Sequence, residues 1–247
     1  DLGTSTLTLD NGIRLNDAVW EIDGTNGGTV QGWWSVGSTT ATSLLFNGGT
    51  YLLNAATGIN AIVSVGGGNF VADGGAKLIC AYEDSYAVDS GNGSVTINEA
   101  VLEGEIYAIY STGNSREIVI NDGAELSANS EFGVITLQGV SPMIRLNGGS
   151  IANYGAGYAV QWIGGTPVLE EPIGSLLKVK NAFVFATRNP ENGAAYLQYV
   201  PDGYTVTGPD SDGYYSLEPE TFTAALLLEE PVETEFVLKK TLLKPQD

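Results

Sequence analysis

One short pattern recurs along the chain, and its spacing restricts the fold more than any other feature. An apolar alternation ends on an asparagine or aspartate that is usually followed by glycine, as in Leu44-Leu45-Phe46-Asn47-Gly48. The anchor residues are Asp23, Asn47, Asp73, Asn98, Asn121 and Asn147, separated by 24, 26, 25, 23 and 26 residues. A period of this length is typical of solenoids, whose repeats bury a shared core by stacking on their neighbours.

Each repeat continues after its anchor in the same order. A second apolar segment places these residues at equivalent positions: Leu52, Leu78, Leu102, Leu126 and Ala152. A third segment carries Tyr86-Ala87-Val88, Tyr107-Ala108-Ile109, Phe132-Gly133-Val134, Tyr158-Ala159-Val160 and Phe183-Val184-Phe185. Three short strands in each coil of about 23–26 residues predict an all-β protein, a right-handed parallel β-helix.

Strand alternation predicts which side chains face the core. Residues one and three before each anchor share one face of the first strand, and we expect them to point inward. These pairs are Trp20/Ile22, Leu44/Phe46, Phe70/Ala72, Val95/Ile97, Ile118/Ile120 and Ile144/Leu146. The anchors fall at the corner, where Asn and Asp tolerate left-handed dihedrals and their side chains can bond the backbone or each other. This favours a structural role for the anchors over a ligand-binding one.

Two regions are expected along the chain. Residues 1–195 form the β-helix, with an incomplete first coil as N-terminal cap. From residue 196 the sequence becomes turn-rich, and two apolar segments, 222–228 and 236–243, read as strands of a hairpin-like appendage. We expect it to cap the last coil or to cover outward apolar residues such as Leu45, Val71 and Val119.

Charge and cysteine content narrow the functional classes. Ten basic residues against 29 acidic ones give a net charge of -19 without any histidine. Such a surface repels phosphate backbones and anionic lipid, which argues against nucleic-acid partners. No apolar run is long enough to predict membrane insertion. The single cysteine, Cys80, cannot form an internal disulfide, and we interpret it as a small core residue because there is no histidine to activate it.

The clearest acidic pair is Asp84 and Glu105, two residues before Tyr86 and Tyr107 on neighbouring coils. Carboxylates at equivalent positions could share a calcium ion, but the next coils offer Ser130 and Ala156 in their place. We therefore favour carboxylates that splay into solvent, and a protein without a cofactor. The stretch Asp210-Ser211-Asp212-Gly213 begins like a calcium loop, yet Thr221 stands where the terminal glutamate belongs, so a turn is expected.

Aromatic residues are the other candidates. The aromatic column consists of Tyr86, Tyr107, Phe132, Tyr158 and Phe183. Facing outward it would be a platform for stacking sugars, and facing inward it would be an aromatic core ladder. We favour the core, because the adjacent Ala and Gly residues are too small to fill a core edge. Trp33, Trp34 and Trp162 are kept as separate surface candidates for ligand binding, and at least one of the adjacent Trp33 and Trp34 should point outward.

With these coils and their Tyr-Ala-Val segments, residues 20–190 resemble the pectin-lyase-like, right-handed β-helix repeat proteins, especially uncharacterised secreted and surface proteins of gut bacteria. The resemblance implies a secreted or cell-surface protein. Polygalacturonase-like members use clustered aspartates and a histidine, and pectate-lyase-like members use an acidic calcium cluster with a basic residue. This chain has no histidine and no such clear motif.

The sequence therefore favours a non-catalytic extracellular module for surface adhesion or glycan recognition, whose partner is a glycan or a host or bacterial surface protein. Two alternatives remain. One is a polysaccharide lyase or other carbohydrate-active enzyme, which rests on fold analogy. The other is a purely structural stalk that binds another protein.

Overall fold

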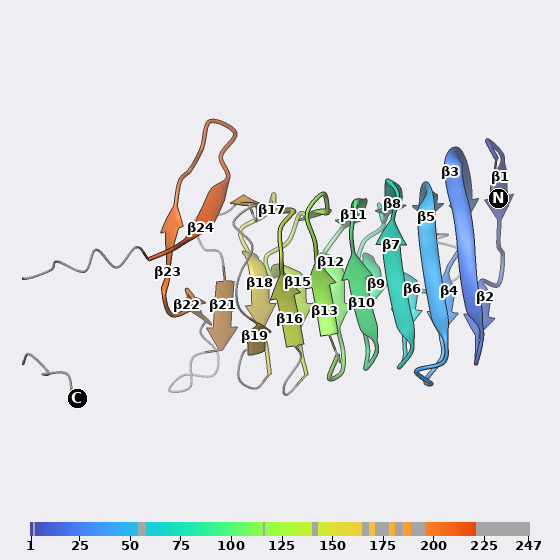
Figure 1. The fold of residues 1–247 in the computed structure, drawn as a ribbon, viewed down its shortest axis with the longest axis horizontal. Helices are drawn as coiled ribbons and strands as arrows, with labels where there is room; N and C mark the ends of the chain where they lie inside the picture. The colour runs from blue at the N-terminus through green and yellow to red at the C-terminus, as the bar shows by residue number, and fades with distance from the viewer. Residues whose placement is uncertain are drawn as a thin grey trace, which may run out of the picture.

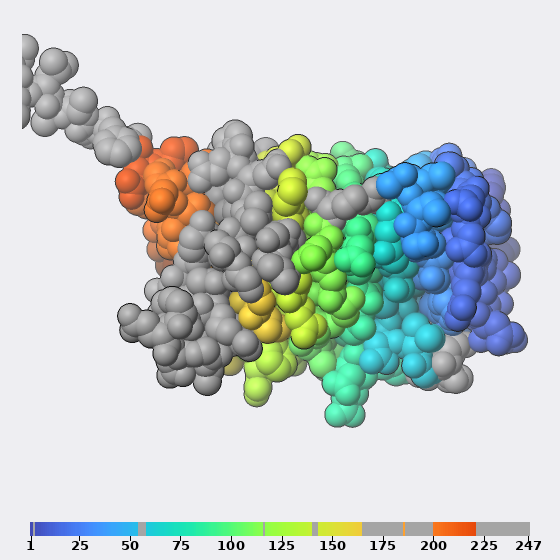
Figure 2. Space-filling model, turned by 90° about the horizontal axis from the view of Figure 1, so that it is seen from below, coloured from blue at the N-terminus to red at the C-terminus, as the bar shows by residue number. Residues whose placement is uncertain are grey.

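The computed structural model describes residues 1, 3–53, 58–115, 117–139, 143–164, 168–170, 178–180, 185–188 and 196–220, with backbone alone for 168–170, 178–180, 186–188 and 196–199. It is a parallel β-helix, as the repeat predicts. Coils stack in chain order along the long axis in Figure 1, and the colours of the space-filling view in Figure 2 change steadily along the same axis. The described residues contain strands and turns but no helix.

Three strands make up each complete coil. The first strands are β3 (Val19–Gln31), β5 (Ser43–Leu52), β7 (Asn69–Asp73), β10 (Ser94–Ile97), β13 (Glu117–Ile120), β16 (Met143–Leu146) and β19 (Val168–Glu170). The second strands are β1 (Thr6–Thr8), β8 (Ala76–Ile79), β11 (Ala100–Gly104), β14 (Glu125–Ala128), β17 (Ser150–Asn153) and β20 (Lys178–Lys180). β3 and β5 run through the corner and supply the second strand as well, so first and second strands belong to one 15-stranded sheet.

The third strands form most of a separate nine-stranded sheet. They are β2 (Ile13–Leu15), β4 (Trp34–Val36), β6 (Ala61–Val65), β9 (Tyr86–Asp89), β12 (Tyr107–Ser111), β15 (Gly133–Leu137), β18 (Tyr158–Trp162) and β21 (Phe185–Arg188). All pairings between successive coils are parallel. The outer surface of this third-strand sheet is the one on which the candidate site lies.

The first-strand core follows the predicted alternation. From Leu44/Phe46 to Ile144/Leu146, all ten inward residues are at most 1% exposed. They stack in register from coil to coil, as when Val95 pairs with Phe70 on one side and with Ile118 on the other. The exception is the first pair, because Trp20 is 44% exposed at the end of the stack and Ile22 is half-buried.

The anchors form a hydrogen-bonded ladder along the corner. The side-chain amide of Asn98 donates to Asp73 Oδ2 at 2.8 Å, Asn121 donates to Asn98 at 2.7 Å, and Asn147 donates to Asn121 at 2.7 Å. Bonding between anchors is thus confirmed. Left-handed dihedrals instead occur at the glycines that follow, such as Gly74 with φ 60°. Glycine takes this backbone conformation without the steric cost that a Cβ imposes.

The predicted second-strand column is wrong at two of its five positions. Leu78, Leu102 and Leu126 do pair with one another, but Tyr51 pairs with Leu78 and Ile151 pairs with Leu126. The predicted Leu52 and Ala152 therefore stand one residue beyond the column. The column residue lies four positions after the anchor in some coils and five in others, and a slip of one residue moves a side chain to the other face.

The register predicted for the third-strand triplets is also wrong by one residue in one coil. Ile135, not Val134, pairs with Ile109 and Val160, and Gly133 takes the place opposite Tyr158 that was predicted for Phe132. Phe185 pairs with Val160 as the predicted triplet requires. Phe183 lies outside the described residues.

Beyond the last coil the strands turn antiparallel. β22 (Tyr196–Tyr199) pairs with β21, while β23 (Tyr204–Thr207) and β24 (Tyr215–Pro219) form a hairpin whose β24 also pairs with β20. Its tip is a turn, as predicted, with Asp210 Oδ1 accepting from the amides of Asp212 and Tyr214. The appendage was predicted from segments 222–228 and 236–243, which lie outside the described residues, whereas the described hairpin comes from residues read as turns. The outward residues Leu45, Val71 and Val119 are half-buried.

Candidate functional site

The four described members of the aromatic column face outward, so the preference for a core ladder is wrong. Phe132 is 42% exposed, and Tyr86, Tyr107 and Tyr158 are half-buried. The alanines beside them are the residues that enter the core, with Ala87, Ala108 and Ala159 all at 0% exposure.

The rings point outward because the chain makes a tight corner just before the third strand. A Cβ added to Gly104 would lie only 1.6 Å from the carbonyl oxygen of Tyr107, which shows how closely the end of β11 approaches the start of β12. Both Ala108 and Ile109 are fully buried, so strict alternation fails at the corner. Small residues fit this narrow part of the core, and the bulky ring before them is turned outward.

The outward rings contact one another and form a platform, defined as Tyr86, Tyr107, Tyr110 and Phe132. Tyr107 and Tyr110 are stacked, with centroids 4.8 Å apart and planes 13° apart. Tyr86 meets Tyr110 edge-on at 5.5 Å, and Tyr107 lies 5.9 Å from Phe132. Tyr110 was not in the predicted column, although its place three residues after Tyr107 marks it as a second aromatic of the same strand.

A groove continues this platform toward the N-terminal end of the molecule. Its volume is about 240 Å³, and its lining includes Arg14, Trp33, Ser64, Tyr86 and Asp89. The Arg14 guanidinium lies over the Trp33 ring, 5.7 Å from its centroid, which is a cation–π geometry. Because Tyr86 belongs to both the groove and the platform, the two form one surface.

Register explains how residues from distant parts of the chain line this surface. The third strands align one position from coil to coil, through Arg14, Ser35, Ser64, Asp89, Tyr110, Thr136 and Gln161. This row is exposed or half-buried from Arg14 to Tyr110, whereas Thr136 and Gln161 are at most 1% exposed. Arg14 therefore stands at one end of a mostly polar row that borders the rings. The anchors and triplets identified in the sequence do not include this row.

Burial perturbs the ionisable groups of the surface. It raises the pKa of the Asp89 carboxyl above its ordinary value, although Asp89 Oδ1 accepts bonds from the Gly91 amide and the Thr112 hydroxyl, both at 3.1 Å. Burial, together with the nearby Asp89 and two tyrosines, raises the pKa of Tyr86 to about 12. The Tyr110 hydroxyl donates to Gln138 Oε1 at 2.6 Å. Burial also raises the pKa of Tyr110, so Tyr86 and Tyr110 are neutral hydroxyls at neutral pH.

The three tryptophans predicted at the surface have different environments. Trp33 is 9% exposed and belongs to the hydrophobic core cluster, although it also lines the groove, so it is a largely buried residue and not the surface residue that was predicted. Trp34 and Trp162 are 1% and 0% exposed and lie in the core, so their predicted surface position is wrong. Trp34 packs edge-on against Phe46 and Trp162 against Phe185, which makes them core aromatics at alternating inward positions.

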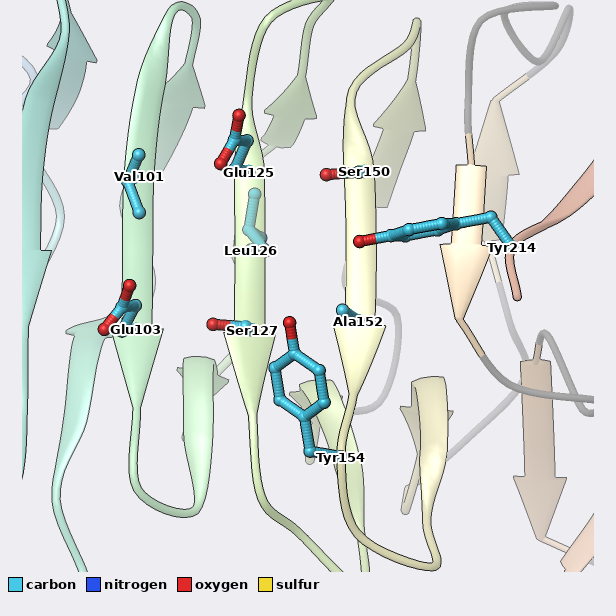
Figure 3. A pocket seen from close by; sticks show the side chains of 9 residues that line it. All are labelled: Val101, Glu103, Glu125, Leu126, Ser127, Ser150, Ala152, Tyr154 and Tyr214. Atoms are coloured by element: carbon cyan, nitrogen blue, oxygen red, sulfur yellow. The ribbon is translucent and has the colours of Figure 1, made fainter. Parts of the chain in front are cut away.

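A second pocket of about 90 Å³ lies on the outer face of the second strands (Figure 3). Glu103 of β11 and Glu125 of β14 line it with two tyrosines, Tyr154 from the corner after β17 and Tyr214 from the hairpin tip. Burial, followed by the effect of Tyr154 and Glu125, raises the pKa of Tyr214. The sequence did not point to this pocket, since it exists only where the hairpin tip reaches back over the coils.

Asp84 and Glu105 are exposed at corners of neighbouring coils, and the Glu105 amide donates to Ser85 O at 3.1 Å. No cluster of three or more Cys, Asp or Glu side chains suited to a metal ion occurs within the described part of the chain. Cys80 is a core residue as expected, 4% exposed, with its thiol donating to Tyr86 O at 3.1 Å. Burial raises the pKa of this thiol to about 12, which keeps it protonated and a poor nucleophile.

Nothing in the described residues forms a helix that is long and apolar enough to cross a membrane. In comparisons with known proteins, no family model, no curated protein and no solved structure matches the chain.

Proposed function

We propose that this chain is a non-catalytic, extracellular module that recognises a glycan on the outer surface of the third-strand sheet. The observation that carries the proposal is the outward aromatic platform, joined through Tyr86 to the groove beneath Arg14 and Trp33. The resemblance of the coils to pectin-lyase-like surface and secreted proteins supports the same reading. The biological role that follows from this resemblance is adhesion to a glycan-bearing surface.

The chemistry of the surface fits a sugar chain. The faces of pyranose rings present C–H groups that stack on aromatic rings, and a tyrosine hydroxyl that donates one hydrogen bond, as Tyr110 does to Gln138, can still accept another. The groove adds an arginine, a carboxylate and serine hydroxyls, the few placed polar groups that fix the orientation of a ligand. Partial burial of the rings limits the side-chain entropy lost on binding.

The length of the surface favours an oligosaccharide. From Trp33, next to β4, the surface reaches Phe132, next to β15, across β6, β9 and β12. Four steps between neighbouring strands at ~4.8 Å each amount to about 19 Å. A chain of several sugar units lying along the helix axis would contact rings on successive coils.

A glycan array tests this proposal. The protein should bind a defined class of oligosaccharides that are neutral or combine neutral and charged sugars. Its affinity should be the same in the presence of calcium and of a chelator, and the oligosaccharide should remain intact. Absence of binding to any glycan would contradict the proposal. The appearance of unsaturated products, followed by their ultraviolet absorbance, would replace it with the lyase alternative.

A further inference from the structure

Asp89 of β9 lies where the groove meets the aromatic platform. Its side chain lines the groove, and its neighbour in register on β12 is Tyr110 of the platform. Burial, followed by the charge of the Asp89 carboxylate, raises the pKa of both Tyr86 and Tyr110, so the carboxylate is close to both rings. These two rings meet edge-on at 5.5 Å. A ligand that runs from the groove onto the platform therefore passes over this carboxylate.

The hydrogen-bond donors to the Asp89 carboxylate are neutral groups. Its Oδ1 accepts from the Gly91 amide and from the Thr112 hydroxyl, both at 3.1 Å. Among the described residues, no arginine or lysine forms an ion pair with it. Its negative charge is therefore not balanced by a cation of the described part of the chain.

The basic residue of the groove stands at its other end. Arg14 is linked to Asp89 in the aligned row through Ser35 and Ser64. Three steps between neighbouring strands at ~4.8 Å each place the two backbones ~14 Å apart. The groove thus presents a positive charge at one end and a negative charge at the end that adjoins the platform.

Covering Asp89 with a ligand favours a cation in that ligand. The residue is already half-buried, and a sugar stacked on Tyr86 and Tyr110 would remove more water from its carboxylate. Burial of an unpaired carboxylate is costly, whereas a charge-assisted hydrogen bond from an ammonium group offsets the loss of hydration. Aromatic rings also attract cations to their faces. The net charge of -19 adds a field that draws cations to the protein.

We propose that Asp89 binds the protonated amino group of an amino sugar that is not N-acetylated, at the point where an oligosaccharide passes from the groove to the platform. The inference rests on the glycan proposal and names one charged unit of its ligand. Tyr86 and Tyr110 border the ammonium group, and neutral sugars lie on the rest of the platform. Arg14 disfavours a second ammonium group at the far end of the groove, which gives the bound chain one direction.

Two matched oligosaccharides test the inference. One is a hexasaccharide of N-acetylglucosamine in which one internal sugar has a free amino group, and the other is the fully N-acetylated hexasaccharide. They share length and linkage and differ only in the acetyl group and its charge. Calorimetric titration near physiological ionic strength limits the contribution of long-range attraction to the acidic protein. The wild type should bind the probe with the free amino group at least about tenfold more tightly.

Two charge-removing variants locate the contact. Asp89→Asn keeps an oxygen that accepts from Gly91 and Thr112, so we expect it to fold. It should weaken the probe with the free amino group about tenfold and bind the N-acetylated probe like the wild type. Asp122→Asn is the matched control, since Asp122 is exposed at the corner after β13 and its Oδ1 accepts from the Gly123 amide at 3.0 Å. This control should bind both probes like the wild type.

The inference is overturned if the wild type fails to bind the probe with the free amino group or binds the two probes equally. These comparisons use the wild type and do not depend on the folding of a variant. Equal weakening of both probes in a folded Asp89→Asn would also overturn it, because Asp89 would then bind hydroxyl groups of neutral sugars. So would an equal loss in Asp122→Asn, which would reflect net charge alone.

Failure of this inference is distinguishable from failure of the glycan proposal. Array binding of neutral glycans alone, lost in Tyr107→Ala and unchanged in Asp89→Asn, would keep the glycan proposal and reject the amino-sugar contact. Absence of binding to any glycan would reject both.

Discussion

At the scale of single residues, the inward column of the first strands accounts for most of the packing. Ile120 is fully buried between Ile97 and Leu146, its partners on the two neighbouring coils. The adjacent Val119 faces outward and is half-buried. Alternation thus assigns two neighbouring residues of similar size to opposite environments.

We expect Ile120→Asp to unfold the coils around it. A carboxylate at this position loses the contacts of the isoleucine and has no cation or hydrogen-bond donor to compensate its burial, which costs at least about 4 kcal/mol. Thermal melting followed by circular dichroism measures the effect, with Val119→Asp as the matched control. The control should cost about 1 kcal/mol or less. Equal destabilisation by the two changes would contradict the assigned strand faces.

The outward turn of the aromatic column could not be read from residue size alone. The small residues after Tyr86 and Tyr107 were taken as too small for the core, yet Ala87 and Ala108 fill a narrow corner in which a larger side chain has no room. Alternation predicts the direction of a side chain within a straight strand. It does not predict where a corner places two successive residues on the inside.

At the scale of strands and corners, the anchor ladder joins one coil to the next. Among the described residues, Asn121 makes two of its bonds, donating to Asn98 and accepting from Asn147, whereas Asn147 makes one. Amide side chains that are satisfied in this way at a partly buried corner stabilise the native state by a modest amount for each bond.

We expect Asn121→Ala to cost about 1–2 kcal/mol, and Asn147→Ala about half as much, because they remove two ladder bonds and one. Equilibrium urea unfolding measures the difference, provided that the dependence of the free energy of unfolding on urea concentration is the same in the variants as in the wild type. Equal costs for the two variants would show that the corner backbone, and not the ladder, is what the side chains stabilise.

The period and the apolar alternation were sufficient to predict the three strands of a coil, the inward first-strand pairs and the bonding between anchors. They were insufficient for register where corner length varies. Tyr51 replaces Leu52 in the second-strand column, and Gly133 replaces Phe132 opposite Tyr158, each by a shift of one residue. Corner length depends on local backbone turns that the apolar pattern does not record.

At the scale of the whole molecule, the stack of coils was predictable because each repeat contacts only its neighbours. The pocket beneath Tyr214 was not, since it depends on a hairpin tip that returns over strands 60 or more residues earlier, such as β17. The groove beside Arg14 likewise depends on the packing of Trp33 against the incomplete first coil. Solenoid periodicity says little about such additions at the two ends.

The central claim is that the platform of the third-strand sheet binds the glycan, and a comparison of two tyrosine variants tests it most directly. Tyr107 lies at the centre of the platform, in contact with Tyr86, Tyr110 and Phe132. Tyr154 is 63% exposed on the second-strand face and is the matched control. Affinity for the best array glycan is measured by calorimetric titration, with melting curves to show that both variants are folded.

We expect Tyr107→Ala to weaken the glycan at least about tenfold, the loss of ~1.4 kcal/mol or more that is typical when a central aromatic contact is removed. Tyr154→Ala should bind like the wild type. Wild-type affinity in a folded Tyr107→Ala, together with loss of binding in Tyr154→Ala, would contradict the account and place the glycan on the second-strand face.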